Sequence, residues 1–439
     1  MVAPENLDLV VMVRIHAGQL EISMSDFRAI ILAAGKGTRM KSELPKVLHQ
    51  VAGRPILEYV LEITKQLRSL KTYVVVGHGA DTVKATIGDG VEYILQDKLL
   101  GTADAVNRCA SAFKNFNGTV LILCGDTPLL SKAIVSDLLK KHKRSNATAT
   151  VLTAILSDPH GYGRMVRDAK GNLQAIREQK DASVDEDKIN EINVGVYCFK
   201  SAALFNALTK VKVNPNKKEF YLTDVVELLL KANQKVDTLT TKDETVAFGV
   251  NTRMHLAQAQ AVIRERILKT HMDNGVTIVD PLTTYIDNDV KIGADTVIYP
   301  CTFIHEGARI GSKCSIGPFA RIRPGSKISD GVQIGNFTEV SRTSVGKNTN
   351  MKHFSFLGDA KVGSNVNIGA GTITANYDGK HKNVTTISDG AFIGSDSVLV
   401  APVKIGKKAV IGAGSLVTRG KNIPAGSTAY GVPVKVVKR

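Results

Sequence analysis

The sequence predicts two structured halves: an α/β domain with a mostly parallel sheet, then a connecting helix and a parallel β-helix. Two observations carry this prediction. From Arg28 to about Gly249, short β-rich runs alternate with longer segments of helical spacing, which is the pattern of βαβ units. From Ile286 onward, aliphatic residues recur at every sixth position, which is the repeat of a parallel β-helix.

In the first half, four apolar, β-rich runs read as strands and three segments between or after them read as helices. The predicted strands are 28–34, 72–77, 91–95 and 119–126, and the predicted helices are 55–67, 102–112 and 132–143. Strands joined through helices run parallel in a sheet covered on both faces, and such sheets bind ligands beyond the carboxyl ends of their strands. LAAGKGTRM, Leu32 to Met40, and Cys124-Gly125-Asp126 both stand at such ends.

A helix is predicted from Asn251 to Met272. Its apolar residues Leu256, Ala259, Ile263 and Ile267 have helical spacing, and Asn274-Gly275 follows as a stop signal. We interpret it as the connection between the two domains.

The second half carries two series of aliphatic residues in one phase. They are Ile286, Ile292, Ile298, Ile304, Ile310, Ile316, Ile322, Ile328, Ile334 and Val340, and then Ile387, Ile393, Leu399, Ile405, Ile411, Val417 and Ile423. We expect them to fill the interior of the β-helix, with no chemical role. The phase slips at Ser341 to Val345, and the polar stretch 375–386 is predicted to leave the β-helix as a loop, where function is expected.

Composition favours an anionic partner. The chain of 439 residues has 57 Lys+Arg against 41 Asp+Glu, a net charge of +16, so nucleic acid and phosphorylated small molecules are both candidates. The lack of tryptophan and an aromatic content of 5% disfavour a base-stacking surface.

The cysteines and the apolar runs predict a cytoplasmic protein. The cysteines show no CxxC spacing, which argues against zinc sites and disulfides; they are Cys109, Cys124, Cys198, Cys301 and Cys314. No apolar run has the length of a membrane span, and the N-terminus does not resemble a signal peptide. We expect Met24 to be the true start, or residues 1–23 to be a loose extension.

The loop after the first predicted strand suits phosphate oxygens. It fits neither the P-loop nor the dinucleotide fingerprint, but Gly35 and Gly37 allow a close backbone approach, and Arg39 and Lys46 can neutralise charge. Asp126 is either a ligand for Mg²⁺ or a helix cap. Gln96 and Gly101-Thr102 stand at another strand end, where they could contact a base, although these residues alone are a weak signal.

Several motifs together resemble one family. They are LAAGKGTRM, LPKVLH, LLGTADAV, CGDTPLL, HGYGR, EQKDA, EINVG and GVNTR, in this order and followed by the hexapeptide array. The chain resembles, over about residues 26–431, the bifunctional N-acetylglucosamine-1-phosphate uridylyltransferase/glucosamine-1-phosphate N-acetyltransferase family. The resemblance implies a Rossmann-like nucleotidyltransferase domain, a left-handed β-helix and a homotrimer, and a role in making UDP-N-acetylglucosamine for cell-envelope synthesis.

The resemblance also implies the site residues of the first half. UTP would be bound by Leu32, Ala33, Ala34, Gly35 and Lys46, with Gln96, Gly101 and Thr102 around the uracil. The sugar would be bound by Gly163, Glu178 and Asn193, and Mg²⁺ by Asp126 and Asn251. A sugar phosphate oxygen would attack the α-phosphorus of UTP and release pyrophosphate, while Arg39 and Lys46 stabilise the developing charge.

In the second half the resemblance makes His353 the base of acetyl transfer, although a lone histidine on a β-helix is more often a surface residue. It implies sugar contacts from Arg323 and Asn367 and acetyl-CoA contacts from Ala370, Asn376, Tyr377, Lys382, Ser395 and Ala413. The chain departs from the family pattern at Ser341, where a lysine is expected, at Phe356, where a tyrosine is expected, and around Tyr430, where an arginine is expected. Arg342 and Lys352 are the nearby cations that could substitute, though Arg342 points to the opposite strand face.

These inferences give a domain plan and three functional hypotheses. The plan is a possible extension 1–23, a nucleotidyltransferase domain 24–249, a linker helix 250–275, an acetyltransferase β-helix 276–431 and a basic tail 432–439. The leading hypothesis is a bifunctional enzyme acting on UTP, a sugar 1-phosphate and acetyl-CoA, without nucleic acid or membrane partners. The alternatives are a nucleotidyltransferase whose β-helix only oligomerises or is a degenerate acyltransferase, and a basic scaffold that binds nucleic acid.

Overall fold

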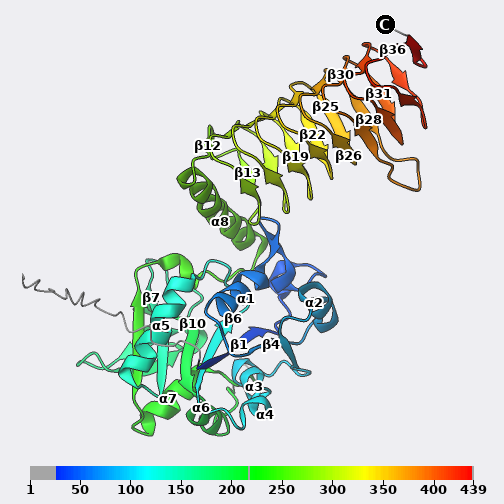
Figure 1. Cartoon of the computed structure of the whole chain (residues 1–439). Coiled ribbons are helices and arrows are strands. Elements are labelled where there is room, and N and C mark those ends of the chain that lie inside the picture. Colours follow the sequence, from blue (N-terminus) through cyan, green and yellow to red (C-terminus); the bar gives the residue numbers. More distant parts are fainter. Residues whose placement is uncertain (1–25, 216–217, 438–439) are drawn as a thin grey trace, which may run out of the picture. The chain divides into compact units, whose positions relative to one another are not determined.

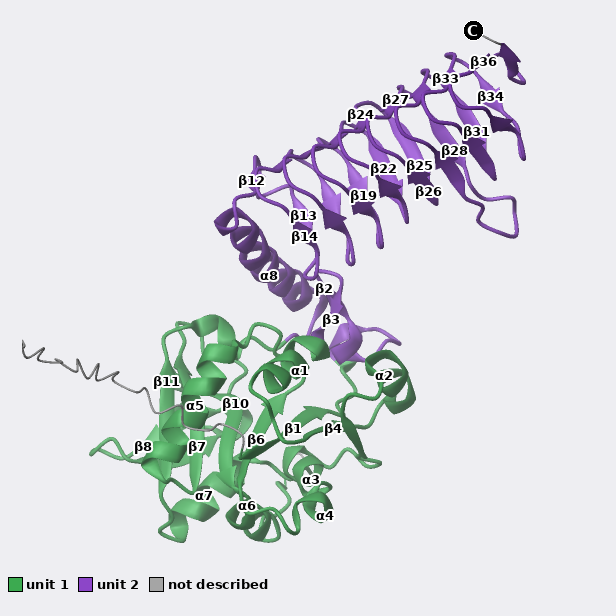
Figure 2. Ribbon diagram, viewed as in Figure 1, with its two compact units in different colours: residues 1–38, 57–249 green, residues 39–56, 250–439 purple. Residues whose placement is uncertain are grey.

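The computed structural model describes residues 26–215 and 218–437, so the expectations for residues 1–23 lie outside the described part. Two compact units divide the chain (Figure 2). The first extends to Thr38 and resumes from Leu57 to Gly249, and the second comprises 39–56 and everything from Val250 onward. The segment 39–56, which carries Lys46, therefore groups with the β-helix half of the chain.

The first unit is built on a mixed sheet with the strand order β11-β7-β10-β6-β1-β4-β5, and β8 and β9 attach beside β10. Its strands are β1 (Phe27–Ala33), β4 (Thr72–Val76), β5 (Glu92–Leu95), β6 (Thr119–Cys124), β7 (Ala149–Ile155), β8 (Arg164–Arg167), β9 (Leu173–Arg177), β10 (Glu191–Lys200) and β11 (Val236–Thr241). The four predicted strands pair in parallel around β1. β10 was not predicted, and it runs antiparallel to β6, β7 and β8.

The helices of the first unit are α1 (Ile56–Gln66), α2 (Ala80–Ile87), α3 (Thr102–Asn107), α4 (Ala110–Phe113), α5 (Lys132–Ser145), α6 (Ser201–Leu208) and α7 (Thr223–Lys231). The helix expected over 102–112 is thus interrupted at Arg108 and Cys109. Buried residues of α3, α4, α6 and α7 join one apolar core with the strands. Ser131 caps α5 by accepting a hydrogen bond from Ile134 N–H, and Asn146 ends it in the left-handed conformation.

The second unit contains the predicted β-helix, whose coils follow one another from β12 to β36 (Thr428–Tyr430) (Figure 1). Its first strands, β12 (Thr277–Ile278), β13 (Tyr285–Ile286) and β14 (Lys291–Ile292), begin three parallel sheets, and each strand up to β33 pairs with the third one after it. The two aliphatic series face the interior and are buried, except that Ile292 is partly exposed. The final strand, β37 (Lys435–Val437), turns back antiparallel to β36.

The phase slip expected at Ser341 to Val345 is a shortened corner, and a second shortened corner that was not predicted follows it. The inward residues Val340 and Val345 are five positions apart, as are Leu357 and Val362, and all four are buried. The predicted loop leaves between β28 (Ile373–Ala375) and β29 (Thr385–Ile387) and projects from the coils (Figure 1). The strands still pair in register across the shortened corners and across the projecting loop.

The connecting helix is α8 (Arg253–Asp273). Thr252 caps it by accepting a hydrogen bond from His255 N–H at 3.1 Å, and Gly275 follows its end with a φ of 86°. The helix packs on β12, β13 and the hairpin of β2 (Gln50–Val51) with β3 (Arg54–Pro55). Among the described residues, no helix combines the length and the apolar character that a bilayer-crossing helix needs.

Candidate functional site

The predicted phosphate loop follows the central strand β1. Leu32 O accepts a hydrogen bond from Gly125 N–H at 2.9 Å, so the ends of β1 and β6 are joined directly. A Cβ atom at Gly77 would lie 2.9 Å from Ala34 O, whereas one at Gly35 would meet no atom within 4 Å. The backbone is therefore packed tightly behind the loop and open at Gly35, where a ligand has room.

The residues predicted to contact uracil form one cluster. Gln96 is buried, and its Nε2 donates to Gly101 O at 3.0 Å and to Asp104 Oδ2 at 2.8 Å. Thr102 Oγ1 accepts a hydrogen bond from Leu222 N–H at 2.9 Å. Because both amide hydrogens of Gln96 have partners, its Oε1 is left as the acceptor that can meet the N3–H group of uracil.

The structure brings Gly163, Glu178 and Asn193 together around β10. Asn193 N–H donates to Gly163 O at 2.9 Å, and the Asn193 amide donates to the Tyr197 hydroxyl at 2.6 Å. Burial raises the pKa of Tyr197, and the nearby charge of Glu178 raises it further. Glu178 and Asn193 therefore both act on the hydroxyl group of Tyr197, Glu178 through its charge and Asn193 through a hydrogen bond.

Glu178 and Asp126 have neighbours that the sequence analysis missed. Glu178 Oε1 accepts a hydrogen bond from Thr223 Oγ1 at 3.1 Å, and burial raises the pKa of the Glu178 carboxyl. Burial also raises the pKa of Tyr162, with Asp126 as the second cause. Tyr162 stands inside the HGYGR motif but no spacing relates it to Asp126, and Thr223 belongs to none of the motifs, so only the folded chain reveals these contacts.

In the second unit, Arg39 and Lys46 converge on Asn251. Arg39 Nη2 lies 3.1 Å from Asn251 Oδ1, and Lys46 Nζ lies 3.0 Å from the same oxygen. Arg253 holds the segment in place, because its Nε donates to Met40 O at 3.2 Å. Three residues that the sequence analysis assigned to nucleotide and metal binding are therefore in direct contact.

His353 lies on the surface of the β-helix, and its backbone oxygen accepts a hydrogen bond from Ser355 Oγ at 2.8 Å. Arg323 is already paired, because its Nη1 lies 3.0 Å from Glu339 Oε1. Asn367 stands in strand β27 (Asn367–Ile368), next to Asn350 of the preceding coil. The imidazole is thus accessible, while the arginine already shares its guanidinium with a carboxylate.

The residues predicted to bind acetyl-CoA fall into two groups. Ala370, Ser395 and Ala413 occupy equivalent positions in three successive coils, each two residues after a buried aliphatic of the same sheet. Asn376, Tyr377 and Lys382 belong to the projecting loop, where the Tyr377 hydroxyl donates to Gly379 O at 2.6 Å. Asp378 holds this loop through backbone hydrogen bonds, which are the main cause that lowers its pKa.

Ser341, one of the positions that depart from the family pattern, and its neighbour Arg342 have well-defined surroundings. Ser341 is fully buried, and within the described part of the chain its Oγ has no hydrogen-bond partner. Arg342 makes a bidentate ion pair with Asp359, with Nε–Oδ1 and Nη2–Oδ2 distances of 2.7 and 2.8 Å. Asp359 also accepts a hydrogen bond from the Asn376 amide. Arg342 therefore supports the projecting loop, and it is not available to replace the expected lysine.

A second group of possible metal ligands was not predicted. Asp287, His305 and Glu306 place ligand atoms within 4.8 Å of one another. Arg321 Nε donates to His305 Nε2 at 3.3 Å, and Asp287 accepts the Glu306 N–H at 3.1 Å. These contacts stabilise a corner of the β-helix, and the guanidinium disfavours a cation there.

Known proteins match both halves of the chain. Residues 28–259 match the family model described as nucleotidyl transferase, and residues 385–419 match the model described as bacterial transferase hexapeptide (six repeats). Bifunctional protein GlmU of Geobacillus sp. (strain WCH70) is 47% identical over 423 residues, which cover 89% of this chain and 92% of that protein.

Other relatives agree with this match. Bifunctional protein GlmU of Geobacillus thermodenitrificans (strain NG80-2) is 46% identical over 92% of this chain and 95% of its own length. The protein of the same name from Bacillus subtilis (strain 168) is 44% identical over 89% of this chain and 93% of its own length. The chain therefore belongs to the GlmU family of bifunctional enzymes, with uridylyl transfer and acetyl transfer as its two activities in the synthesis of UDP-N-acetylglucosamine.

Proposed function

We propose that the strand ends of the first unit bind UTP and N-acetylglucosamine 1-phosphate, and that Arg39 and Lys46 stabilise the charge of the transferred phosphoryl group. The observation that carries this proposal is the convergence of both cations on Asn251 Oδ1, at 3.1 and 3.0 Å. Two cations so close repel each other unless an anion or a polar oxygen lies between them. Their arrangement suits a polyphosphate.

The proposed uridylyl transfer needs no covalent intermediate. A phosphate oxygen of the sugar 1-phosphate attacks the α-phosphorus of UTP, the bond to the β-phosphate breaks, and pyrophosphate leaves. Alignment and charge neutralisation supply the catalysis. Leu32 to Gly35 contact the triphosphate with backbone N–H groups, Gln96 Oε1 accepts from the uracil, and Glu178 with Asn193 and Gly163 binds the sugar.

The residues assigned to the metal suit Mg²⁺. Asp126 offers a carboxylate oxygen and Asn251 an amide oxygen, and Mg²⁺ prefers oxygen ligands of this kind together with substrate phosphates. When bound, the ion would neutralise phosphate charge during the transfer. Asn251 Oδ1 becomes available to it when Arg39 and Lys46 turn to the phosphates of the nucleotide.

The proposed acetyl transfer takes place on the β-helix. The amine of glucosamine 1-phosphate attacks the thioester carbonyl of acetyl-CoA, the carbon–sulfur bond breaks, and CoA leaves as the thiolate. His353 accepts the proton that the amine loses. Arg323 binds the sugar phosphate and Asn367 the glucosamine. The acetyl-CoA contacts come from Ala370, Asn376, Tyr377, Lys382, Ser395 and Ala413.

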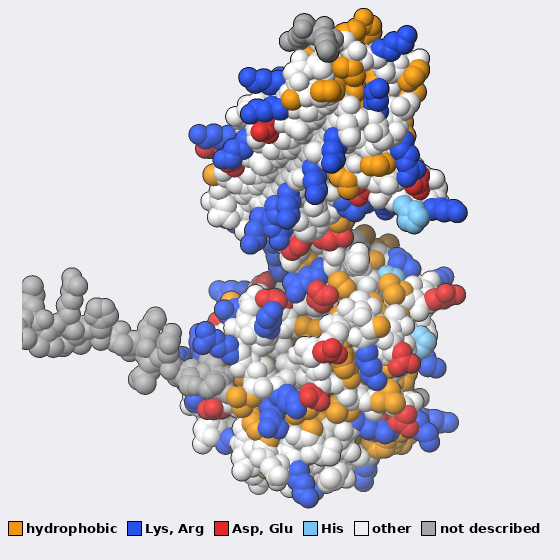
Figure 3. All heavy atoms as spheres, turned by 45° about the vertical axis from the view of Figure 1, so that its right-hand side comes forward, with side chains coloured by type: hydrophobic (Ala, Val, Ile, Leu, Met, Phe, Trp, Pro, Cys, Tyr) orange, Lys and Arg blue, Asp and Glu red, His pale blue; other side chains and the backbone are white. Residues whose placement is uncertain are grey.

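A homotrimer fits the exposed surface of the β-helix. Phe319, Phe337 and Phe354 are 50%, 62% and 56% exposed, and the first two rings are stacked with centroids 5.0 Å apart. Hydrophobic side chains also reach the visible face of the β-helix among many lysines and arginines (Figure 3). Large exposed apolar groups mark association surfaces, and the solution mass by light scattering tests for three copies.

The five free cysteines suit the reducing cytoplasm, which cell fractionation tests.

Two substitutions test the two-site assignment in an assay with glucosamine 1-phosphate, acetyl-CoA, UTP and Mg²⁺. Asp126→Ala should lower pyrophosphate release by at least about 10²-fold and leave thiol release unchanged. His353→Ala should lower thiol release by roughly 10²- to 10⁴-fold and leave pyrophosphate release from N-acetylglucosamine 1-phosphate unchanged. If each variant lost both activities equally, the assignment would be wrong.

A further inference from the structure

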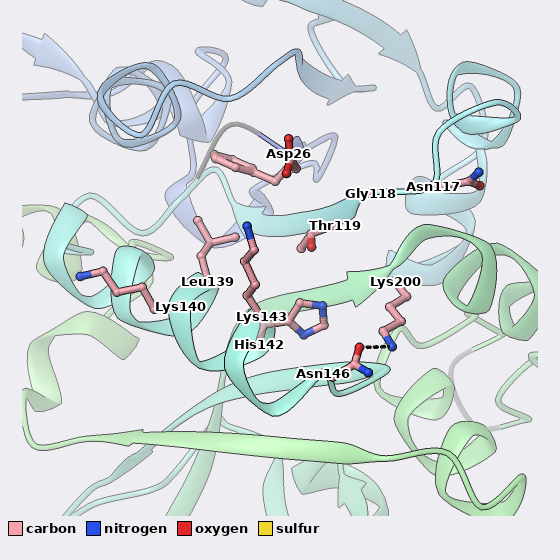
Figure 4. Close-up of a pocket in the computed structure, with 11 residues that line it drawn as sticks. Asp26, Asn117, Gly118, Thr119, Leu139, Lys140, His142, Lys143, Asn146 and Lys200 are labelled. Carbon is pink, nitrogen blue, oxygen red and sulfur yellow. Dashed lines mark hydrogen bonds between the residues drawn. The ribbon is translucent and has the colours of Figure 1, made fainter. Parts of the chain in front are cut away.

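A hollow of about 230 Å³ lies at the edge of the first unit's sheet that is opposite the predicted nucleotide site. Its lining includes Phe27 and Thr119, the first residues of β1 and β6, and Lys200, the last residue of β10 (Figure 4). β1 and β6 run from this hollow to the phosphate loop and to Asp126 at their other ends. The hollow is therefore a separate place from the catalytic edge.

The lining is cationic. The residues that line it include three lysines, Lys140, Lys143 and Lys200, and one acidic residue, Asp26, and Lys140 Nζ also lies 3.3 Å from Asp137 Oδ1. Lys200 Nζ lies 2.7 Å from the Asn146 amide oxygen, a neutral partner that leaves the positive charge uncompensated (Figure 4). Ammonium groups that line a recess raise the local concentration of anions.

A buried polar side chain completes the lining. His142 is 3% exposed, and its Nδ1 lies 2.8 Å from Thr150 Oγ1. Burial lowers the pKa of His142 to about 4, with Lys200 acting in the same direction and Asp237 opposing it. The ring is therefore neutral at pH 7, and with Nδ1 engaged, Nε2 is the nitrogen that a ligand in the hollow can reach.

We propose that this hollow is a binding site for a small anion with one or two phosphoryl groups, held by Lys143, Lys200 and His142. Lysine ammonium groups suit phosphate oxygens as point charges. Pockets for drug-sized ligands measure about 300 to 1,000 Å³, and this one is smaller. The size suits pyrophosphate or a small phosphorylated metabolite and is too small to enclose a whole nucleoside triphosphate.

Calorimetric titration with pyrophosphate tests the proposal on the full chain. UTP is added to saturation so that its β- and γ-phosphates fill the pyrophosphate subsite of the catalytic site, and metal and sugar phosphate are left out so that no transfer runs. The test variant is Lys143→Gln with Lys200→Gln. The matched control is Lys132→Gln with Lys141→Gln. Both lysines lie on α5 and do not line this hollow, so the control removes the same number of positive charges elsewhere.

The wild type and the control should bind pyrophosphate with equal affinity, and the test variant at least tenfold more weakly. Uridylyl transfer and the melting temperature should be the same in all three proteins, which separates this proposal from the assignment of the catalytic site. Equal binding by all three proteins, or no saturable binding by the wild type, would overturn the proposal.

Discussion

Asp359→Asn is the sharpest test of the proposed acetyl-CoA site, because Asp359 connects a departure from the family pattern to the projecting loop. Its carboxylate forms the bidentate ion pair with Arg342 and accepts from the Asn376 amide. The side chain of Asp359 is 14% exposed, while that of Arg342 is 39% exposed. The substitution keeps the size of the side chain and removes its charge.

The size of the effect follows from these contacts. Hydrogen bonds to charged groups contribute about 1.5 to 3 kcal/mol each, and the exposure of Arg342 places its pair at the low end of that range. If the interactions that hold Asn376 in place weaken by about 1.5 kcal/mol, the equilibrium constant for its ordered position falls about tenfold. We therefore expect the KM for acetyl-CoA to rise about tenfold, with a much smaller change in kcat.

The assay is the initial rate of thiol release at varied acetyl-CoA concentration. Asp330→Asn is the matched control, because Asp330 likewise combines one hydrogen bond, accepted from the backbone N–H of Ser312, with an ion pair to a cation, Lys347, on another coil. An unchanged KM for acetyl-CoA in Asp359→Asn would refute the reasoning. An equal rise in the control would show that the loop does not depend on Asp359 in particular.

Three further predictions concern the first reaction and the stability of the first unit. Lys46→Ala should lower kcat/KM for uridylyl transfer by roughly 10²-fold, as expected for lost transition-state charge stabilisation, and leave thiol release unchanged. Gln96→Leu should raise the KM for UTP about tenfold and reduce the preference for UTP over CTP in competition assays, because an acceptor for the uracil N3–H is lost. The pKa of His142 is about 4 in the folded chain against 6.5 ordinarily, so the unfolded chain binds the extra proton and stability falls as the pH drops from 6.5 to 4, by about 3 kcal/mol. Urea unfolding should show a flatter pH dependence in His142→Gln, and an unchanged slope would contradict the assignment.

The β-helix could be predicted almost completely from sequence because each coil repeats the same local rule. An aliphatic at the inward position of one strand lies over the aliphatic of the next coil, as Ile304 lies beside Ile322. Neither the spacing nor the burial depends on a distant segment. Even the slip at Ser341 to Val345 is visible in the phase, and the structure absorbs it as a five-residue step.

The mixed sheet of the first unit could not be predicted in the same way. β10 reads as an ordinary apolar strand, and nothing in its own sequence selects an antiparallel partner. Its bulge between Asn193 and Tyr197, where Gly195 adopts a φ of 82°, directs the Asn193 amide onto the Tyr197 hydroxyl. The candidate residue was thus identified by resemblance, but its partner depends on long-range pairing.

In the proposed acetyl-transfer site of the second unit, the departures from the family pattern at Ser341 and Phe356 depend on each other. Ser341 pairs with Gly358 of the next coil, and the ring of Phe356 lies over the place where Gly358 would carry a Cβ atom. A lysine at position 341 would need a path for its long stem beside this ring, so Ser341 and Phe356 fit each other as a pair. Arg323 is then the cation that remains of the residues assigned to the sugar phosphate, and Glu339 competes with the substrate for its guanidinium. This competition weakens substrate binding more than it slows proton transfer to His353, so the substitutions at this site should alter the KM for glucosamine 1-phosphate before they alter kcat.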